Sequence, residues 1–282
     1  MSKSKKWPKH GNPDTPISIV ASRALGDRLK AVRRLAPLAA KQAAKDVEHV
    51  HRFRVAIRRA SAALNLYSPL LSTQKSRKVK RQLRNLRRAA GPARDLDVLS
   101  ERLERAESNF AANLSGGKAQ KGFAELRDMI GVKRRKAQKR LKRACRGAEK
   151  TCFSKDGKKL VESVRWKLKG KEPRFRTYAQ GMFRQVLDGF FAAGRADLND
   201  IEALHQLRIE GKSVRYAMEL LSPAFEGSFR KDLYPVFASV QERLGAINDH
   251  ASAIAFYCDL LKSTDLRAGG CSIKSMIELE KT

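Results

Sequence analysis

Two histidine–arginine pairs with the same spacing are the residues of this sequence best suited to bind an anion. Each pair is followed by a further cation four residues on, which gives the sets His51, Arg54, Arg58 and His205, Arg208, Lys212. In a helix, residues at i, i+3 and i+7 lie on one face. Arginine binds phosphate oxygens in pairs, lysine acts as a point charge, and histidine titrates near neutral pH. Each set therefore indicates a site for a multivalent anion, or a histidine packed against a neighbouring helix under solvated cations.

The two sets belong to a longer internal repeat. Residues 46–71 align without a gap to residues 200–225 at an offset of 154, and eight of the 26 pairs are identical. Unrelated segments of this composition would share about two, so the match predicts a duplication. The same offset relates Gly91–Asp95 to Gly245–Asp249. We expect the aspartate of each copy to cap a helix or to orient a histidine or arginine.

A strongly cationic segment follows the first copy. Residues 75–94 contain nine Lys or Arg and no Asp or Glu, while the apolar residues keep the spacing of a helix with one buried side. The positive charges of such a segment repel one another unless a bound anion neutralises them. Its candidate binding residues are Arg77, Lys80, Arg81, Arg84, Arg87 and Arg88, and Arg215 extends the second set. Residues 234–242 have lost most of these charges, so we expect the first copy to contribute more cations. A further block, 133–146, holds nine basic residues and is expected either to widen this surface or to be a solvated connector.

Helical periodicity runs through nearly the whole chain, and no alternating strand pattern is present. The expected helices are 17–41, 46–67, 73–90, 94–113, 119–147, 156–168, 174–194, 200–221, 227–245, 249–263 and 272–281. Glycine pairs at 116–117 and 269–270 punctuate the series. These features predict an all-α protein of two pseudo-symmetric four-helix bundles that arose from the duplication. We expect a flexible basic arm (1–16), a first bundle (about 17–147), a hinge (about 148–172), a second bundle (about 156–265) and a C-terminal tail (266–282).

The charge of the chain favours polyanions as partners. There are 60 Lys and Arg against 29 Asp and Glu in 282 residues, a formal net charge of +31, and 42% of residues are hydrophobic. Nucleic acid, anionic membranes and polyphosphate are all attracted by such a field. No apolar stretch is long enough to span a bilayer, and the N-terminus does not read as a secretory signal. The four scattered cysteines are expected to be reduced thiols of a cytoplasmic protein.

The duplicated His-x-x-Arg helix, the basic helix with Leu-x-x-Leu spacing and the Gly-x-x-[Arg/Asn]-Asp segment resemble the CHAD domain, the conserved histidine α-helical domain. The resemblance covers roughly residues 17–265. It implies two four-helix bundles with a basic surface that binds inorganic polyphosphate, and association with polyphosphate granules. The positions that match are His51, Arg54, Arg58, Arg84, Arg88, His205, Arg208 and Lys212. Many members also carry a triphosphatase domain with Glu-x-Glu-x-Lys near its start, which we do not expect here.

The leading hypothesis is a non-enzymatic polyphosphate-binding protein of the cytoplasm, without a metal or cofactor. Non-specific nucleic-acid binding is the alternative, although aromatic residues make up only 7% and form no stacking platform. A third hypothesis is histidine phosphotransfer, because residues 205–211 faintly resemble the His-x-x-Lys-Gly segment of phosphotransfer bundles. No Asp/Glu cluster with two-metal spacing, nucleotide-cradling glycine loop or Ser/His/Asp order is evident to support other catalysis.

Overall fold

The chain is described by a computed structural model that covers residues 6–7, 10–111, 117–151 and 153–262. Within these ranges the protein is helical and contains no strand, which confirms the all-α prediction. The helices are α1 (Ile17–Lys41), α2 (Glu48–Leu66), α3 (Thr73–Ala111), α4 (Gly117–Lys150), α5 (Phe153–Val161), α6 (Phe175–Gly194), α7 (Ile201–Leu221) and α8 (Tyr234–Lys262). Short turns of other helix types are η1 (Ser68–Leu70), η2 (Ser222–Ala224) and η3 (Phe229–Leu233).

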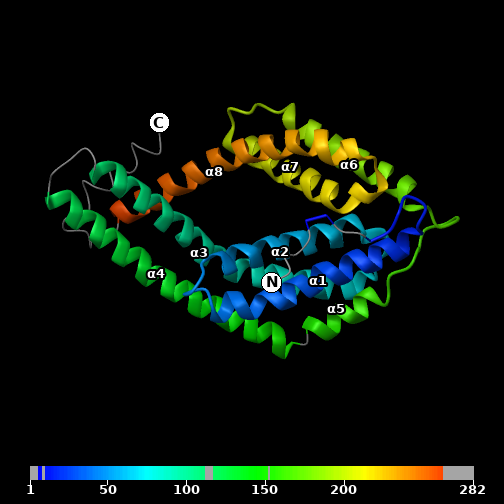
Figure 1. The fold of residues 1–282 in the computed structure, drawn as a ribbon, viewed down its shortest axis with the longest axis horizontal. Coiled ribbons are helices and arrows are strands. Elements are labelled where there is room, and N and C mark those ends of the chain that lie inside the picture. Colours follow the sequence, from blue (N-terminus) through cyan, green and yellow to red (C-terminus); the bar gives the residue numbers. More distant parts are fainter. Residues whose placement is uncertain (1–5, 8–9, 112–116, 152, 263–282) are drawn as a thin grey trace.

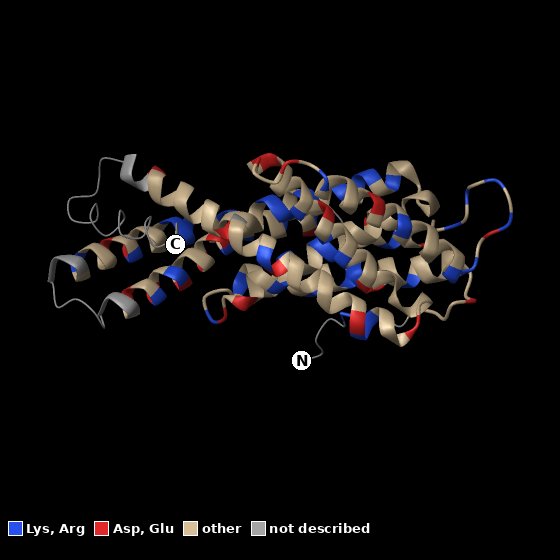
Figure 2. Ribbon diagram, turned by 90° about the horizontal axis from the view of Figure 1, so that it is seen from above, with Lys and Arg blue, Asp and Glu red and all other residues tan. Residues whose placement is uncertain are grey.

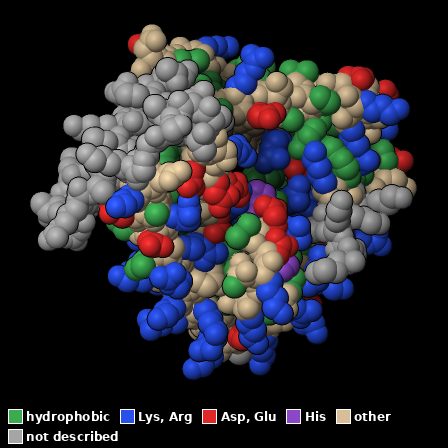
Figure 3. Space-filling view, turned by 60° about the vertical axis from the view of Figure 1, so that its left-hand side comes forward, with side chains coloured by type: hydrophobic (Ala, Val, Ile, Leu, Met, Phe, Trp, Pro, Cys, Tyr) green, Lys and Arg blue, Asp and Glu red, His purple; other side chains and the backbone are tan. Residues whose placement is uncertain are grey.

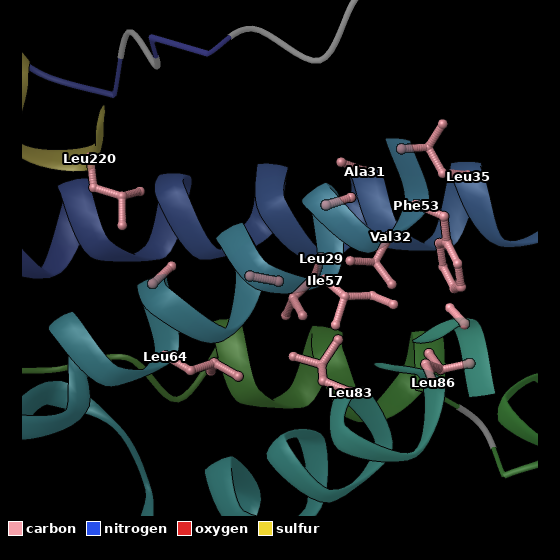
Figure 4. Close-up of a cluster of buried hydrophobic side chains, with 14 of the residues drawn as sticks. Leu29, Ala31, Val32, Leu35, Phe53, Ile57, Leu64, Leu83, Leu86 and Leu220 are labelled. Atoms are coloured by element: carbon pink, nitrogen blue, oxygen red, sulfur yellow. The ribbon is translucent and has the colours of Figure 1, made fainter. Parts of the chain in front are cut away.

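Helices α1, α2, α3 and α4 form a four-helix bundle, in which α2 packs on α1 and α3, and α4 packs on α3 and α1 (Figure 1). Its core is built from the apolar positions of each helix: Ile57 of α2 lies between Val32 of α1 and Leu83 of α3, and Phe53 of α2 points toward Leu86 of α3 (Figure 4). The short helix α5 packs against α1 and α3. The segment 148–172, expected as a hinge, is thus partly bound to the first bundle through α5.

As far as residue 262, where the described part ends, the second half contains α6, α7 and α8, and α7 packs on both of the others (Figure 1). The predicted helices 227–245 and 249–263 are a single helix from Tyr234 onwards, and 73–90 and 94–113 are likewise joined as α3. The breaks were expected at Gly-Pro and Gly-Ala, but Pro92 lies inside α3. One missing backbone hydrogen bond costs less than the packing of α3 against α2 and α4 supplies. The predicted helix 272–281 lies outside the described residues.

The helix order repeats at the offset of the sequence repeat. Adding 154 to the bounds of α1, α2 and α3 gives 171–195, 202–220 and 227–265, close to α6, α7 and η3–α8. Each of α2 and α7 is followed by one turn of 3₁₀-helix at Ser-Pro, where proline ends the α-helix. The duplication itself remains a prediction, but its two copies have the same local structure. The counterpart of α4 would begin near 271, outside the described part.

The two halves meet where α2 packs on α7. Glu219 is fully buried there and accepts hydrogen bonds from Nε and Nη2 of Arg59 at 2.6 and 3.1 Å and from Tyr234 at 3.4 Å. Arg215 lies 3.6 Å from the same carboxylate. Burial and the charge of Arg59 lower the pKa of the neighbouring Arg28, while Glu219 raises it. A single carboxylate thus holds a group of arginines at the junction.

The N-terminal segment contacts both halves, contrary to the expected flexible arm. The carbonyl of Lys6 accepts from Arg28, and Trp7 meets the ring of Tyr234 edge-on at 4.8 Å. The backbone of residues 13–15 accepts hydrogen bonds from residues 175 and 176 at the start of α6. The described residues before α1 therefore belong to the folded protein.

Candidate functional site: a cationic cavity between the two halves

The two His-x-x-Arg sets meet in one cavity of about 600 Å³ between α2, α3, α7 and α8. Its lining includes the predicted residues His51, Arg54, Arg58, His205 and Arg208. Figure 3 shows histidine side chains next to acidic and basic side chains in the hollow near the centre of one face. The cavity forms because α2 and α7 turn the same face of the repeat toward each other.

Each copy holds its arginine with its own aspartate. Nη1 of Arg54 donates to Asp95 at 2.7 Å and to the carbonyl of Gly91 at 2.9 Å. In the second copy Nη2 of Arg208 lies 3.7 Å from Asp249. Both aspartates lie inside long helices, so the expected capping role is wrong and the orienting role matches the geometry. The carboxylates restrict the arginine forks, which lowers the entropy lost when an anion binds.

Helix α7 begins at an aspartate that does cap it. Asp200 is the N-cap and accepts from the backbone N–H of Glu202 and Ala203 at 3.2 and 3.1 Å. In the first copy Asp46 accepts from the N–H of Glu48 at 2.9 Å, but the N-cap position is taken by Val47. The aspartate at this repeat position is therefore the N-cap in one copy and lies one residue before the N-cap in the other.

Lys212 lies next to the cavity among other cations. Burial lowers its pKa to about 7, with further lowering from Arg208, Arg58 and Arg215, while Asp249 raises it. The pKa of Arg208 is also lowered, first by burial and then by Arg58. Lys212, Arg208 and Arg58 are close enough to repel one another electrostatically, and a negatively charged ligand would reduce this repulsion.

The surroundings of His51 oppose its protonation. An ordinary histidine becomes positively charged below about pH 6.5, and His51 departs from this behaviour. Its pKa is lowered instead, mainly by burial and also by Arg94, Arg58 and Arg54, against a raising effect of Glu48. Without a bound anion, the cavity therefore disfavours the charged form of His51 compared with an ordinary histidine.

The predicted residues of α3 lie outside this cavity. Arg77, Arg81 and Arg84 line a separate groove of about 490 Å³ against α5. Lys80, Arg87 and Arg88 are in α3 but in the lining of neither space. Arg215 pairs with Glu219 at the junction and lies over the ring of Tyr216 at 4.8 Å, so its main partners are structural.

The cavity also contains residues that the sequence did not single out. Arg94 and Arg102 of α3 and Phe256 of α8 belong to the lining, and Lys133 of α4 lies 5.3 Å from the ring centre of Phe256. Arg94 also donates to Glu101 at 3.1 Å. The signal for Arg102 was its position seven residues after Asp95 on the same face of α3. It was missed because 73–90 and 94–113 were read as separate helices.

Lys and Arg are spread along many of the helices, with fewer Asp and Glu among them (Figure 2). Their numbers differ between the halves. Helices α1–α5 contain 37 Lys and Arg against 11 Asp and Glu, a net charge of +26. Helices α6–α8 together with η3 contain 9 against 8, a net charge of +1. Of the five arginines in the cavity lining, Arg208 comes from the second half and the other four come from the first.

In the part of the chain that the structure describes, none of the helices is both long and apolar enough to cross a membrane. The free thiols there are those of Cys145 and Cys258, and burial raises the pKa of Cys145 to about 11. Cys152 and Cys271 lie outside the described residues.

Comparison with known proteins agrees with this architecture. The structure is similar to the crystal structure of the CHAD domain from the plant Ricinus communis, with a TM-score of 0.72 and 18% identity over 99% of this chain and 90% of that one. It is equally similar to PptA from Streptomyces chartreusis, with a TM-score of 0.72 and 17% identity over 94% of each chain. No curated protein sequence matches the chain. The model of the CHAD domain matches residues 23–257, and the chain therefore belongs to the CHAD domain family.

Proposed function

We propose that this protein binds inorganic polyphosphate in the cavity between its halves, and that it does so without catalysing a reaction. The observation that carries the proposal is the meeting of the two His-x-x-Arg sets in a cavity of about 600 Å³. Its lining has five arginines against two aspartates, Asp95 and Asp249, and each aspartate already faces an arginine. Family membership supports the same ligand, because the resemblance to CHAD domains implied polyphosphate binding.

The chemistry of the lining suits a flexible chain of phosphates. Every phosphate unit of such a chain carries negative charge, and guanidinium forks form strong charge-assisted hydrogen bonds with phosphate oxygens. Binding releases the counterions that surround a polyanion, so the affinity should fall steeply as the salt concentration rises. The phosphate units of the chain are identical, so the cavity can bind the chain at any of several positions along its length.

Nucleic acid fits the cavity less well. Single-stranded nucleic acid is usually bound on several aromatic platforms, and Phe256 is the one Phe, Tyr or Trp in the lining. Phosphotransfer by His205 is also less favoured, because the glycine that suggested it has a packing role. A side chain on Gly211 would meet the side chains of Gln241 and Phe190.

Titration of the wild-type protein and of a double variant tests the proposal. Arg54→Ala/Arg208→Ala removes one guanidinium group from each copy of the repeat. We expect the affinity for polyphosphate to fall about 10- to 100-fold. The matched control is Arg52→Ala/Arg243→Ala, which also removes two positive charges, one from an exposed arginine of each half. Equal losses in both variants would show that the cavity is not the binding site.

Competition identifies the preferred anion. Polyphosphate should displace single-stranded DNA or RNA from the protein at equal phosphate concentration. The reverse order would favour nucleic acid as the ligand. We further propose a cytoplasmic location at polyphosphate granules, which a fluorescent fusion would test by its overlap with stained granules and by its redistribution in cells unable to make polyphosphate.

A further inference from the structure

A second cationic groove lies between the amino-terminal part of α3 and helix α5, apart from the cavity. It has a volume of about 490 Å³. The lining consists of Gln74, Lys75, Arg77, Lys78, Arg81, Arg84, Asp156 and Lys159. Of these, Asp156 is the one carboxylate, and the six Lys and Arg come from both walls of the groove.

The carboxylate of this groove is already engaged. Asp156 accepts from Lys78 at 2.9 Å and from Nε2 of Gln82 at 3.0 Å, and its side chain is only 12% exposed. Gln82 also donates to the carbonyl of Thr151, so α5 and the turn before it are held against α3. The walls of the groove are therefore fixed, with Arg77, Arg81 and Arg84 on the α3 wall and Lys159 on the α5 wall.

Two further features favour an anion here. Arg77 and Arg81 are exposed and lie four residues apart, on one face of α3. The groove is at the amino end of a 39-residue helix that begins at Thr73, where the helix dipole adds positive potential. Mutual repulsion between the cations is relieved when a phosphate chain occupies the groove.

The groove and the cavity are connected along α3. Positions 77, 81, 84, 88, 91, 95 and 102 recur at steps of three, four or seven residues, which places them along one face. Arg84 in the groove and Asp95 in the cavity are eleven residues apart, a distance of about 16 Å along a helix. The exposed Arg87 and Arg88 lie between them. Cations are thus available along the whole path.

We propose that this groove is a second binding site for phosphate chains, and that a polyphosphate long enough to reach both sites binds the groove and the cavity together. The proposal rests on the proposed function of the cavity. A chain held in one site is present at a high effective concentration at the other, so its second contact costs little further entropy. The protein thereby distinguishes long from short polyphosphate.

The test compares two ligands, tripolyphosphate and long-chain polyphosphate, by calorimetric titration. Wild-type protein should bind two tripolyphosphate molecules, and Arg77→Ala/Arg81→Ala should bind one with unchanged affinity at the cavity. For the long chain the same variant should lose about tenfold or more in affinity, because only one site remains. Arg140→Ala/Arg143→Ala is the matched control, since it removes two exposed arginines from α4. This control should retain both tripolyphosphate sites and most of the advantage of the long chain.

The outcomes separate the groove from the cavity. A single tripolyphosphate site in the wild type, abolished by Arg54→Ala/Arg208→Ala, would overturn the groove and leave the cavity in place. Equal long-chain losses in the groove variant and its control would also overturn the groove. Failure of wild-type protein to bind either ligand would overturn the proposed function, and with it this inference.

Discussion

Lys212 should couple polyphosphate binding to the uptake of a proton. Its pKa is about 7 because it is buried beside Arg208, Arg58 and Arg215, with only Asp249 acting in the opposite direction. A bound polyanion adds negative charge next to the amine and favours the protonated form. The affinity is therefore highest below pH 7, where Lys212 is already charged, and decreases as the pH rises through 7.

The size of this effect follows from linkage between the two equilibria. If the bound phosphates restore the ordinary pKa of a lysine, the affinity falls about tenfold between pH 6 and pH 8. At pH 8 about one in ten free molecules carries the proton, so binding takes up about 0.9 proton. The terminal phosphates of the ligand also titrate in this range, and a variant is needed to separate their contribution.

Two substitutions isolate Lys212. Lys212→Met removes the titrating amine and should remove the tenfold component, whereas Lys212→Arg stays charged and should bind equally well on both sides of pH 7 apart from the background. The proton uptake is measured by calorimetry at pH 8 in two buffers of different ionisation enthalpy. If Lys212→Met keeps the full pH slope and proton uptake of the wild type, the reasoning from the burial of Lys212 is wrong.

Two further predictions concern the contacts that hold the two halves together. Glu219→Gln should lower the free energy of unfolding by about 3–5 kcal/mol in urea denaturation, because the partly buried Arg59 loses its charged partner. The control, Glu226→Gln at an exposed position, should change the free energy of unfolding by less than about 0.5 kcal/mol. Equal effects of the two substitutions would contradict the role of Glu219 at the junction. Tyr178→Phe should cost about 1–3 kcal/mol, because its hydroxyl donates to the carbonyl of Leu66 at 2.6 Å. The stacked Tyr67, whose hydroxyl has no hydrogen-bond partner among the described residues, provides the matched control: Tyr67→Phe should cost little, and similar losses would refute the assignment.

The central cavity was largely predictable because its key residues are repeated. Helical periodicity placed His51, Arg54 and Arg58 on one face, and the second copy made a shared anion site the best explanation. The helix ends next to Ser68 and Ser222 also follow from local chemistry, since proline comes next in each copy.

The breaks expected at Gly91 and Gly245 failed for a physical reason. Glycine and proline lower the helix stability of an isolated segment. In the folded protein α3 and α8 remain continuous because their apolar sides are packed along their length. Reading α3 as two helices separated Arg102 from the stripe to which it belongs.

The separate groove could not be found from the sequence, because it depends on where α5 packs. Buried Phe153, Gly157 and Leu160 attach α5 to the first bundle, and Gly157 allows close contact with Leu29. Only this placement brings Lys159 opposite Arg77. Hydrophobic periodicity predicts each helix but does not show which distant helices pack together.

The division of charge between helices of +26 and of +1 makes the protein a strong electric dipole. A polyanion at a distance exerts a torque on such a particle and turns its first half forward before any residue touches the ligand. Electrostatic steering of this kind raises the rate of association, and it weakens once the salt concentration shortens the screening length. Many copies that arrive on the same polyanion would therefore share one orientation, with their nearly neutral halves facing the solvent.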